Sequence, residues 1–164
     1  MHDRSNKVYI VMGAPGSATS FISKALEEQG VKMGNTKGDR LRFYENKEFG
    51  DLNTEILEKA GGSSTEPPLE KEILKVDVDN KIKKLIKKYK DRFWGWKDPK
   101  NSLTVKKYLP YLEDDVYLIC CFRKPKHILN EYNWFRKRRS DEENMKLVNA
   151  YNKAIISAIK EFTS

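Results

Sequence analysis

The sequence predicts an α/β fold in which a small parallel sheet is flanked by helices in three layers. Three apolar runs have the residue types of buried strands, and they occupy residues 8–12, 93–96 and 116–122. The segments between them repeat apolar residues at helical spacing. Strands that alternate with helices are typical of parallel sheets with right-handed crossovers. We therefore expect three parallel strands, with the first and third adjacent or nearly so, and with the third, the most apolar run, in the centre.

The first strand runs directly into a loop of small residues and then into a helix. Val8–Met12 is followed by Gly13–Ser20, and Phe21–Gln29 has the apolar period of a helix. Such a loop would bring backbone N–H groups and hydroxyls to a helix N-terminus, where the macrodipole favours an anion. A phosphate group fits this pattern. The candidate binding residues are Gly13, Pro15, Gly16, Ser17, Ala18, Thr19 and Ser20.

This loop matches the nucleotide-binding pattern G-x-x-x-x-G-K-[ST] only in part. Ala18 stands at the second glycine and Thr19 at the lysine. The sequence also has no evident Walker-B carboxylate, so the residues that split a β–γ phosphate bond are missing. ATPase and kinase activity are therefore disfavoured, while phosphate binding and an ordinary strand-to-helix loop both remain open.

The other segments predict helices that cover the sheet. Gly30 is suited to end the first helix, and residues 31–40 have no clear period, so we expect an irregular segment there. Ser140 and Glu143 have the spacing of a capping box at the start of the last helix. The helices expected after residue 40 cover residues 47–60, 69–89 with a break near 77–80, 102–112 with a perturbation near Pro110, 126–139 and 141–162.

Composition and charge predict a globular chain with an anionic partner. With 164 residues, 38% of them hydrophobic, we expect a single domain over residues 1–164. The formal net charge of +8 favours an anionic ligand, and nucleic acid is a candidate that we do not favour. Lys81–Lys88 is predicted to form the solvated face of an amphipathic helix. Arg136–Arg139 follows several aromatic residues, which suits either an anion-binding patch or a solvated helix end.

The sequence also predicts a cellular location and a cysteine state. No apolar run is long enough to span a membrane, and residues 1–7 do not resemble a signal peptide, so we expect a cytoplasmic protein. Cys120 and Cys121 are adjacent within a predicted strand. Neighbouring strand residues point to opposite faces, so these two thiols are poorly placed to form a disulfide.

Charged residues follow the second and third predicted strands. Lys97 and Asp98 come directly after residues 93–96, and Arg123 comes directly after residues 116–122. The carboxyl ends of parallel strands meet at one edge of the sheet, where ligands of open α/β sheets bind. We therefore expect one crevice to collect the phosphate-binding loop, a lysine and an arginine.

Two segments resemble the P-loop sulfotransferases, which move a sulfuryl group from 3′-phosphoadenosine-5′-phosphosulfate (PAPS) to an acceptor. Gly13–Ser20 is similar to the loop G-x-x-R-S-G-T-[ST] that binds the 5′-phosphosulfate in that family. Trp94–Lys100 with Ser102–Thr104 is similar to the segment W-x-W-K-D-P-R-x-S-L-T of bacterial members, and this is the most specific match. The resemblance implies a P-loop-type fold.

Two further segments extend the resemblance over most of the chain. Arg123–Pro125 resembles the R-x-P of the family's 3′-phosphate motif. Phe43–Asn46 is similar to part of a Y-x-E-N…LN…L segment, which continues in Leu52, Asn53, Ile56 and Leu57. Three positions depart from the family pattern: Gly16 replaces an arginine, Ala18 replaces a glycine, and Glu131 replaces a serine.

The resemblance implies roles for individual residues. Lys97 would stabilise the leaving group, the loop would hold the 5′-phosphate, and Arg123 would bind the 3′-phosphate. Glu45 would be the general base, although an exposed carboxylate without a role suits the sequence equally well. The reaction would need PAPS and no metal, and would release 3′-phosphoadenosine 5′-phosphate (PAP). The acceptor would be a small molecule or a polymer with a hydroxyl or amine.

Two other functions remain open from the sequence. One is a nucleotide- or polyanion-binding protein that kept this fold and lost transfer, which the changes at Gly16 and Glu131 favour. The other is a small P-loop kinase, which would need ATP and Mg²⁺.

Overall fold

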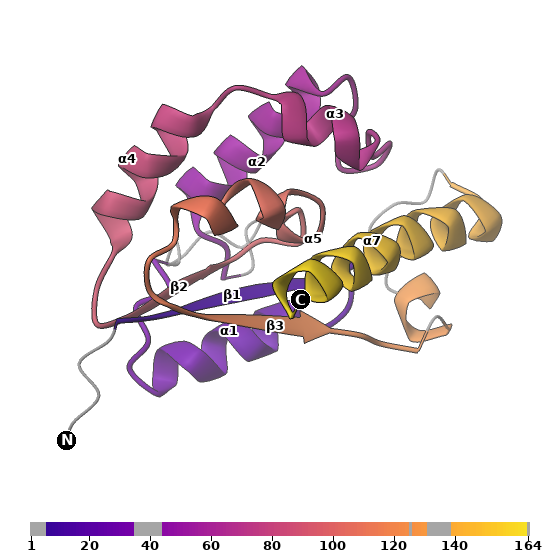
Figure 1. Ribbon diagram of the computed structural model, residues 1–164. Helices are drawn as coiled ribbons and strands as arrows, with labels where there is room; N and C mark the ends of the chain where they lie inside the picture. Colours follow the sequence, from indigo (N-terminus) through magenta and orange to yellow (C-terminus); the bar gives the residue numbers. More distant parts are fainter. Residues whose placement is uncertain (1–5, 35–43, 125, 131–138, 164) are drawn as a thin grey trace.

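Three parallel strands form the sheet around which the chain is built (Figure 1). The computed structural model describes residues 6–34, 44–124, 126–130 and 139–163. The strands are β1 (Lys7–Gly13), β2 (Phe93–Lys97) and β3 (Asp115–Cys121), in the order β2-β1-β3. The predicted α/β class, the parallel pairing and the adjacency of the first and third runs are confirmed.

β1, and not β3, is the central strand. It pairs with β2 on one side and with β3 on the other, so the expectation that the third run is central was wrong. Within the described residues β3 is an edge strand, and its Tyr117 is 43% exposed. Phe122 lies beyond the end of β3 and is also exposed. An apolar run indicates that other elements cover the faces of the strand. The position of the strand in the sheet depends instead on which strands form hydrogen bonds with it.

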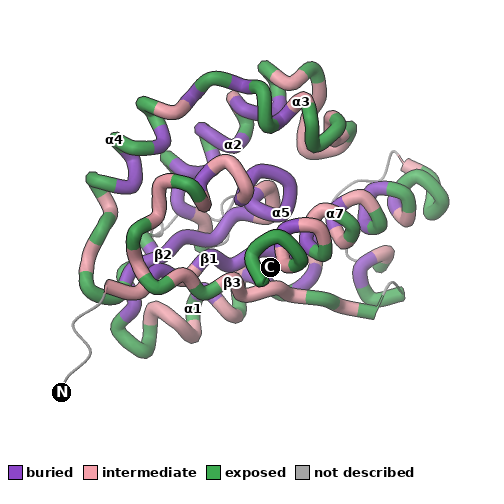
Figure 2. The backbone as a smooth tube through the Cα atoms, in the orientation of Figure 1, coloured by how far each residue is buried: buried purple, intermediate pink, exposed green. Residues whose placement is uncertain are grey.

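Helices cover both faces of the sheet, in the layers that the sequence predicts. Val8, Ile10 and Met12 of β1 point into the larger core, together with side chains of the helices on that face. Val11 points to the other face and packs in a smaller cluster with Ile22 of the first helix. Figure 1 shows α1 (Thr19–Glu28) on one side of the sheet and three helices on the other, α2 (Lys47–Lys59), α5 (Asn101–Thr104) and α7 (Asp141–Phe162). In Figure 2 β1 is mostly buried, and the outer surfaces of α7 and of α4 (Asp79–Tyr89) are exposed.

The helices follow the predicted segments closely. The break near Asp77 is confirmed, because the segment divides into two helices around Val76–Val78. Gly30 ends the first helix with a φ of +87°. The helices are α1 (Thr19–Glu28), α2 (Lys47–Lys59), α3 (Glu70–Lys75), α4 (Asp79–Tyr89), α5 (Asn101–Thr104) and α7 (Asp141–Phe162), and residues 126–130 are also helical.

One predicted helix is not continuous. Residues 102–112 form the end of α5 and then two 3₁₀ turns, η1 (Val105–Lys107) and η2 (Leu109–Tyr111). Pro110 has no N–H to donate and lies at the start of the second turn, so an α-helix cannot continue through it. The last helix begins as predicted, because the Ser140 and Glu143 side chains form both hydrogen bonds of a capping box.

The lysines of α4 lie on its solvated face, as predicted. Ile82, Leu85 and Ile86 of this helix are buried, and its lysines are exposed. Lys81 and Lys88 form ion pairs with carboxylates of α2, so part of this positive charge is balanced within the fold.

Cys120 and Cys121 are free thiols that pack toward opposite faces, as predicted. No helix in the described part of the chain is long and apolar enough to cross a membrane. Glu131 and Arg136–Arg138 lie outside the described residues, as do Phe43, Pro125 and residues 35–40 of the expected irregular segment.

Candidate functional site

The candidate phosphate-binding loop, Gly13–Ser20, begins where β1 and β3 approach each other closely. Gly13 pairs with Cys121, and a Cβ atom on Gly13 would lie 2.8 Å from the Cys121 carbonyl oxygen. It would also lie 2.9 Å from Cγ2 of Thr19, at the start of α1. Both distances are shorter than real Cβ contacts, so only glycine fits here. This close approach places the N-terminus of α1 directly above the end of the sheet.

The loop then turns sharply before α1. The Ser17 N–H donates to the Ala14 carbonyl at 3.0 Å, which makes a tight turn that includes Pro15. Gly16 has a φ of +87° and Ala18 a φ of +64°, both in the left-handed region. Ala18 is the N-cap residue of α1, and it offers no side-chain cap to the first turn.

The donors of this loop suit an anion. Among the described residues, the N–H groups of Gly16, Ala18 and Thr19 have no hydrogen-bond partner. The Ser17 hydroxyl is 4% exposed and likewise has no partner there. Unpaired donors at the positive end of a helix dipole stabilise a bound phosphate or sulfate. The residues present therefore fit the 5′-phosphosulfate group that the resemblance implies.

Ala18→Gly is expected to raise the free energy of unfolding by about 0.5–1 kcal/mol. A left-handed backbone is strained for alanine and not for glycine, and the Ala18 side chain is exposed and makes no cap. Urea denaturation measures the change. Ala25→Gly, in the middle of α1, is the matched control and should lower the free energy of unfolding by about 1 kcal/mol. A destabilised Ala18→Gly variant would contradict the left-handed conformation.

Lys97 lies at the carboxyl end of β2 and is only 2% exposed. Its Nζ donates to the Ser20 hydroxyl at 3.2 Å and to Oε1 of Glu45 at 3.0 Å. A buried ammonium group is costly unless it is paired. Here it is paired on one side with the candidate phosphate-binding loop and on the other with the candidate base. The predicted lysine, loop and glutamate are therefore brought together at one point.

Two helices position Glu45. Tyr44, just before it, has a φ of +60°, and its carbonyl accepts a hydrogen bond from the buried hydroxyl of Ser23 in α1. Asn46, just after it, is the N-cap of α2, and its Oδ1 accepts from the N–H groups of Glu48 and Phe49. The backbone on each side of Glu45 is thus tied to a different helix. Ser23 carries no motif, and sequence reasoning did not find its part in the site.

The environment of Glu45 changes its acidity. Burial raises the pKa of Glu45 above the ordinary value of a glutamate. The Lys97 charge lowers the pKa in opposition, and the Asp98 carboxylate raises it. Because burial dominates, this carboxylate binds a proton more readily than an exposed glutamate. A general base works best when its pKa approaches the pH of the reaction, so the shift has the sign that proton abstraction requires.

A buried amide network holds the end of β2 in place. The Asn101 Oδ1 accepts from the indole N–H of Trp96 and from the Asn53 amide, both at 2.9 Å. The Asn101 Nδ2 donates to the Val11 carbonyl of β1 at 3.0 Å. Trp96 directly precedes Lys97, so this network fixes the strand end that carries the lysine and joins it to β1 and α2. The resemblance pointed to Asn53, but not to Asn101, because a buried asparagine cannot be told from an exposed one by residue type.

Asp98 is completely buried next to Lys97. Its Oδ1 accepts from the Lys100 N–H at 2.7 Å, which shapes the turn after β2. Its Oδ2 accepts no hydrogen bond within the described chain, although the Lys100 Nζ lies 3.1 Å away. This carboxylate therefore adds negative charge close to Glu45, and its hydrogen bond with the Lys100 N–H holds the turn after β2.

Arg123 also reaches the loop. It follows β3 by two residues, and its Nη1 donates to the Gly16 carbonyl at 2.8 Å. The carboxyl ends of all three strands thus contribute to one site, as the sequence predicts. His127 is exposed on the helical segment after Arg123.

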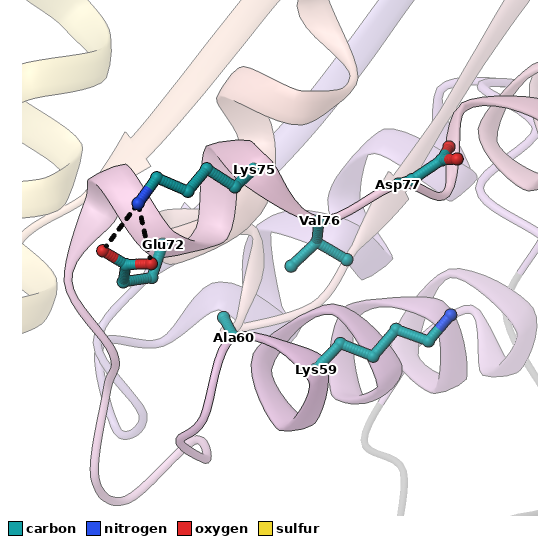
Figure 3. Close-up of a pocket in the computed structure, with 6 residues that line it drawn as sticks. All are labelled: Lys59, Ala60, Glu72, Lys75, Val76 and Asp77. Carbon is teal, nitrogen blue, oxygen red and sulfur yellow. Dashed lines mark hydrogen bonds and ion pairs between the residues drawn. The ribbon is translucent and has the colours of Figure 1, made fainter.

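A separate pocket lies at the far end of α2. It has a volume of about 310 Å³, and its lining residues come from the end of α2 and from the region of α3, as Figure 3 shows. Its charges are mixed, and Lys75 is paired with Glu72 within it. Glu45 precedes the opposite end of α2, which is roughly 20 Å long for 13 residues. This pocket is therefore not part of the candidate phosphate-binding site.

Comparisons of the chain with protein-family models, with curated proteins and with solved structures gave no match.

Proposed function

We propose that the chain is a sulfotransferase that moves a sulfuryl group from PAPS to a hydroxyl or amine acceptor on a P-loop-type fold. The observation that carries the proposal is the position of Lys97. Its buried ammonium group bonds both a hydroxyl of the phosphate-binding loop and the carboxylate of Glu45. A cation between an anion site and a base is the arrangement that transfer of an anionic group needs.

The donor would supply a sulfuryl group joined to the 5′-phosphate by a bridging oxygen. During transfer the acceptor oxygen or nitrogen forms a bond to sulfur while the bond from sulfur to the bridging oxygen breaks, so negative charge grows on that oxygen. Lys97 would stabilise this charge, and the loop N–H groups with Thr19 and Ser20 would hold the phosphate. Glu45 would accept the proton that the acceptor loses.

The second candidate is a protein that binds a nucleotide or polyanion without transferring a group. The ion pair between Lys97 and Glu45 favours it, because a largely buried pair of this kind also serves as a structural link between β2 and the segment just before α2. The absence of an arginine at Gly16 favours it as well.

The test is release of PAP from PAPS across a panel of hydroxyl and amine acceptors, in buffer with EDTA. A sulfotransferase is expected to turn over without metal, and calorimetry should show tighter binding of PAP than of AMP. PAP binding without turnover for every acceptor would favour the binding protein. In a separate assay without EDTA, transfer of phosphate from ATP that requires Mg²⁺ would instead favour a kinase.

A further inference from the structure

The phosphate-binding loop has no basic side chain of its own. Gly13–Ser20 contains neither lysine nor arginine. A phosphate held only by N–H groups and hydroxyls retains most of its charge, and phosphate sites commonly add a lysine or arginine. Lys97 lies nearby, but its ammonium group is shared with the Glu45 carboxylate. A second cation beside the loop would therefore neutralise more of the charge of a bound phosphate.

The loop conformation explains why that cation is not in the loop. Gly16 occupies the position where the similar family has arginine, and its φ of +87° is one that L side chains rarely adopt. An arginine there would strain the turn that Ser17 closes onto Ala14. A basic side chain has to reach this point from another element.

β3 delivers such a side chain. The pairing of Gly13 with Cys121 aligns the ends of β1 and β3, so the two chains leave the sheet side by side. Arg123 then lies beside the loop, and its Nη1 donates to the Gly16 carbonyl at 2.8 Å. A guanidinium group has five N–H donors in a planar fork. One of them fixes the group against the loop, and the fork can present others to an anion on the same loop.

We propose that Arg123 binds the anion held by Gly13–Ser20, on the 5′ side of the donor, and not the 3′-phosphate. The inference rests on the proposed function only for the identity of that anion as the 5′-phosphate of an adenine nucleotide. Arg123 supplies the positive charge that the similar family has in an arginine at the position of Gly16. The two positions are 107 residues apart in the sequence.

The experiment compares how Arg123 affects two ligands that differ only in the 3′-phosphate. Calorimetric titrations of the whole chain with AMP and with PAP are made for the parent, for Arg123→Ala and for Arg123→Gln. Both variants should lower the affinity for AMP and the affinity for PAP by the same factor, about 10- to 100-fold, as expected for a lost charge-assisted contact. Lys126→Ala, an exposed charge on the following helical segment, is the control and should change either affinity by less than about fivefold.

The outcomes separate this inference from the proposed function. Weaker binding of PAP with unchanged binding of AMP would assign Arg123 to the 3′-phosphate and overturn the inference. If the parent binds inorganic pyrophosphate but neither AMP nor PAP, the proposed function fails. The affinities of Arg123→Ala and Arg123→Gln for pyrophosphate are then compared with that of the parent. A loss of about tenfold or more there supports the role of Arg123, and a smaller loss refutes it. A parent that binds none of these anions overturns both. Arg123→Gln keeps a polar amide in place of the guanidinium group, so it separates the loss of the charge from the larger truncation in Arg123→Ala.

Discussion

Glu45→Gln is expected to lower turnover by roughly 10²–10⁴, the contribution of a positioned general base. The amide keeps the shape of the side chain and can still accept a hydrogen bond from Lys97, but it cannot take a proton from the acceptor. Binding of PAP should be nearly unchanged, because the proposed contacts to the nucleotide come from the loop and from Arg123. The measurement is the rate of PAP release from PAPS, with calorimetry for PAP affinity.

The pH profile gives this prediction a second readout. As the proposed base, Glu45 must be ionised for turnover, so the rate is expected to fall as the pH is lowered through the pKa of this group. Burial raises that pKa, and the fall is therefore expected above about pH 4.3, the value of an unperturbed glutamate. Glu48→Gln, at the exposed first turn of α2, is the matched control and should change neither the rate nor the profile. A Glu45→Gln variant with the parent rate would exclude Glu45 as the base.

Lys97→Ala is expected to lower turnover by roughly 10²–10³ with little loss of PAP affinity. A cation aimed at charge that develops during transfer acts mainly in the transition state, so its removal lowers the rate more than it weakens ligand binding. The same assay and titration measure both quantities. The variant also removes the charge that lowers the pKa of Glu45, so its remaining activity should decline at a higher pH than that of the parent.

Two comparisons keep this result interpretable. Lys47→Ala removes an exposed lysine close in sequence to Glu45, and its rate should stay within about fivefold of the parent. Lys97→Met replaces the buried stem with an apolar chain of similar length, which limits the loss of packing. If Lys97→Met binds PAP and turns over like the parent, Lys97 does not stabilise the leaving group. If both Lys97 variants lose PAP binding as well as turnover, the ion pair has a structural role.

Local patterns in the sequence were sufficient for most elements of the fold. Val8–Met12 is a run of β-branched and apolar residues that reads as a buried strand without reference to any other segment. Ser140 and Glu143 contact each other across three residues, so their capping box is visible in the sequence. Pro110 signalled a disturbance, but not how early the α-helix would stop, because 3₁₀ turns have nearly the same local pattern.

The order of the strands was not a local property. Residues 116–122 are the most apolar run, yet β3 lies at the edge of the sheet in the described chain. Which strand is central depends on pairing between residues about 85–110 positions apart, such as the pairing of Tyr9 with Gly95 in β2 and with Tyr117 in β3. No periodicity within one segment records such a pairing.

The sequence by itself determined where the site lies. A loop of small residues after one strand, Lys97 after the second and Arg123 after the third must meet, because parallel strands share one carboxyl edge. Only the tertiary structure decided which of these groups form hydrogen bonds and ion pairs with one another. It set Lys97 between Ser20 and Glu45, and Arg123 against the Gly16 carbonyl. The physical reason is that an ion pair or hydrogen bond depends on distances of about 3 Å between side-chain atoms. Strand order places the side-chain atoms only to within the spacing between neighbouring strands, about 4.8 Å.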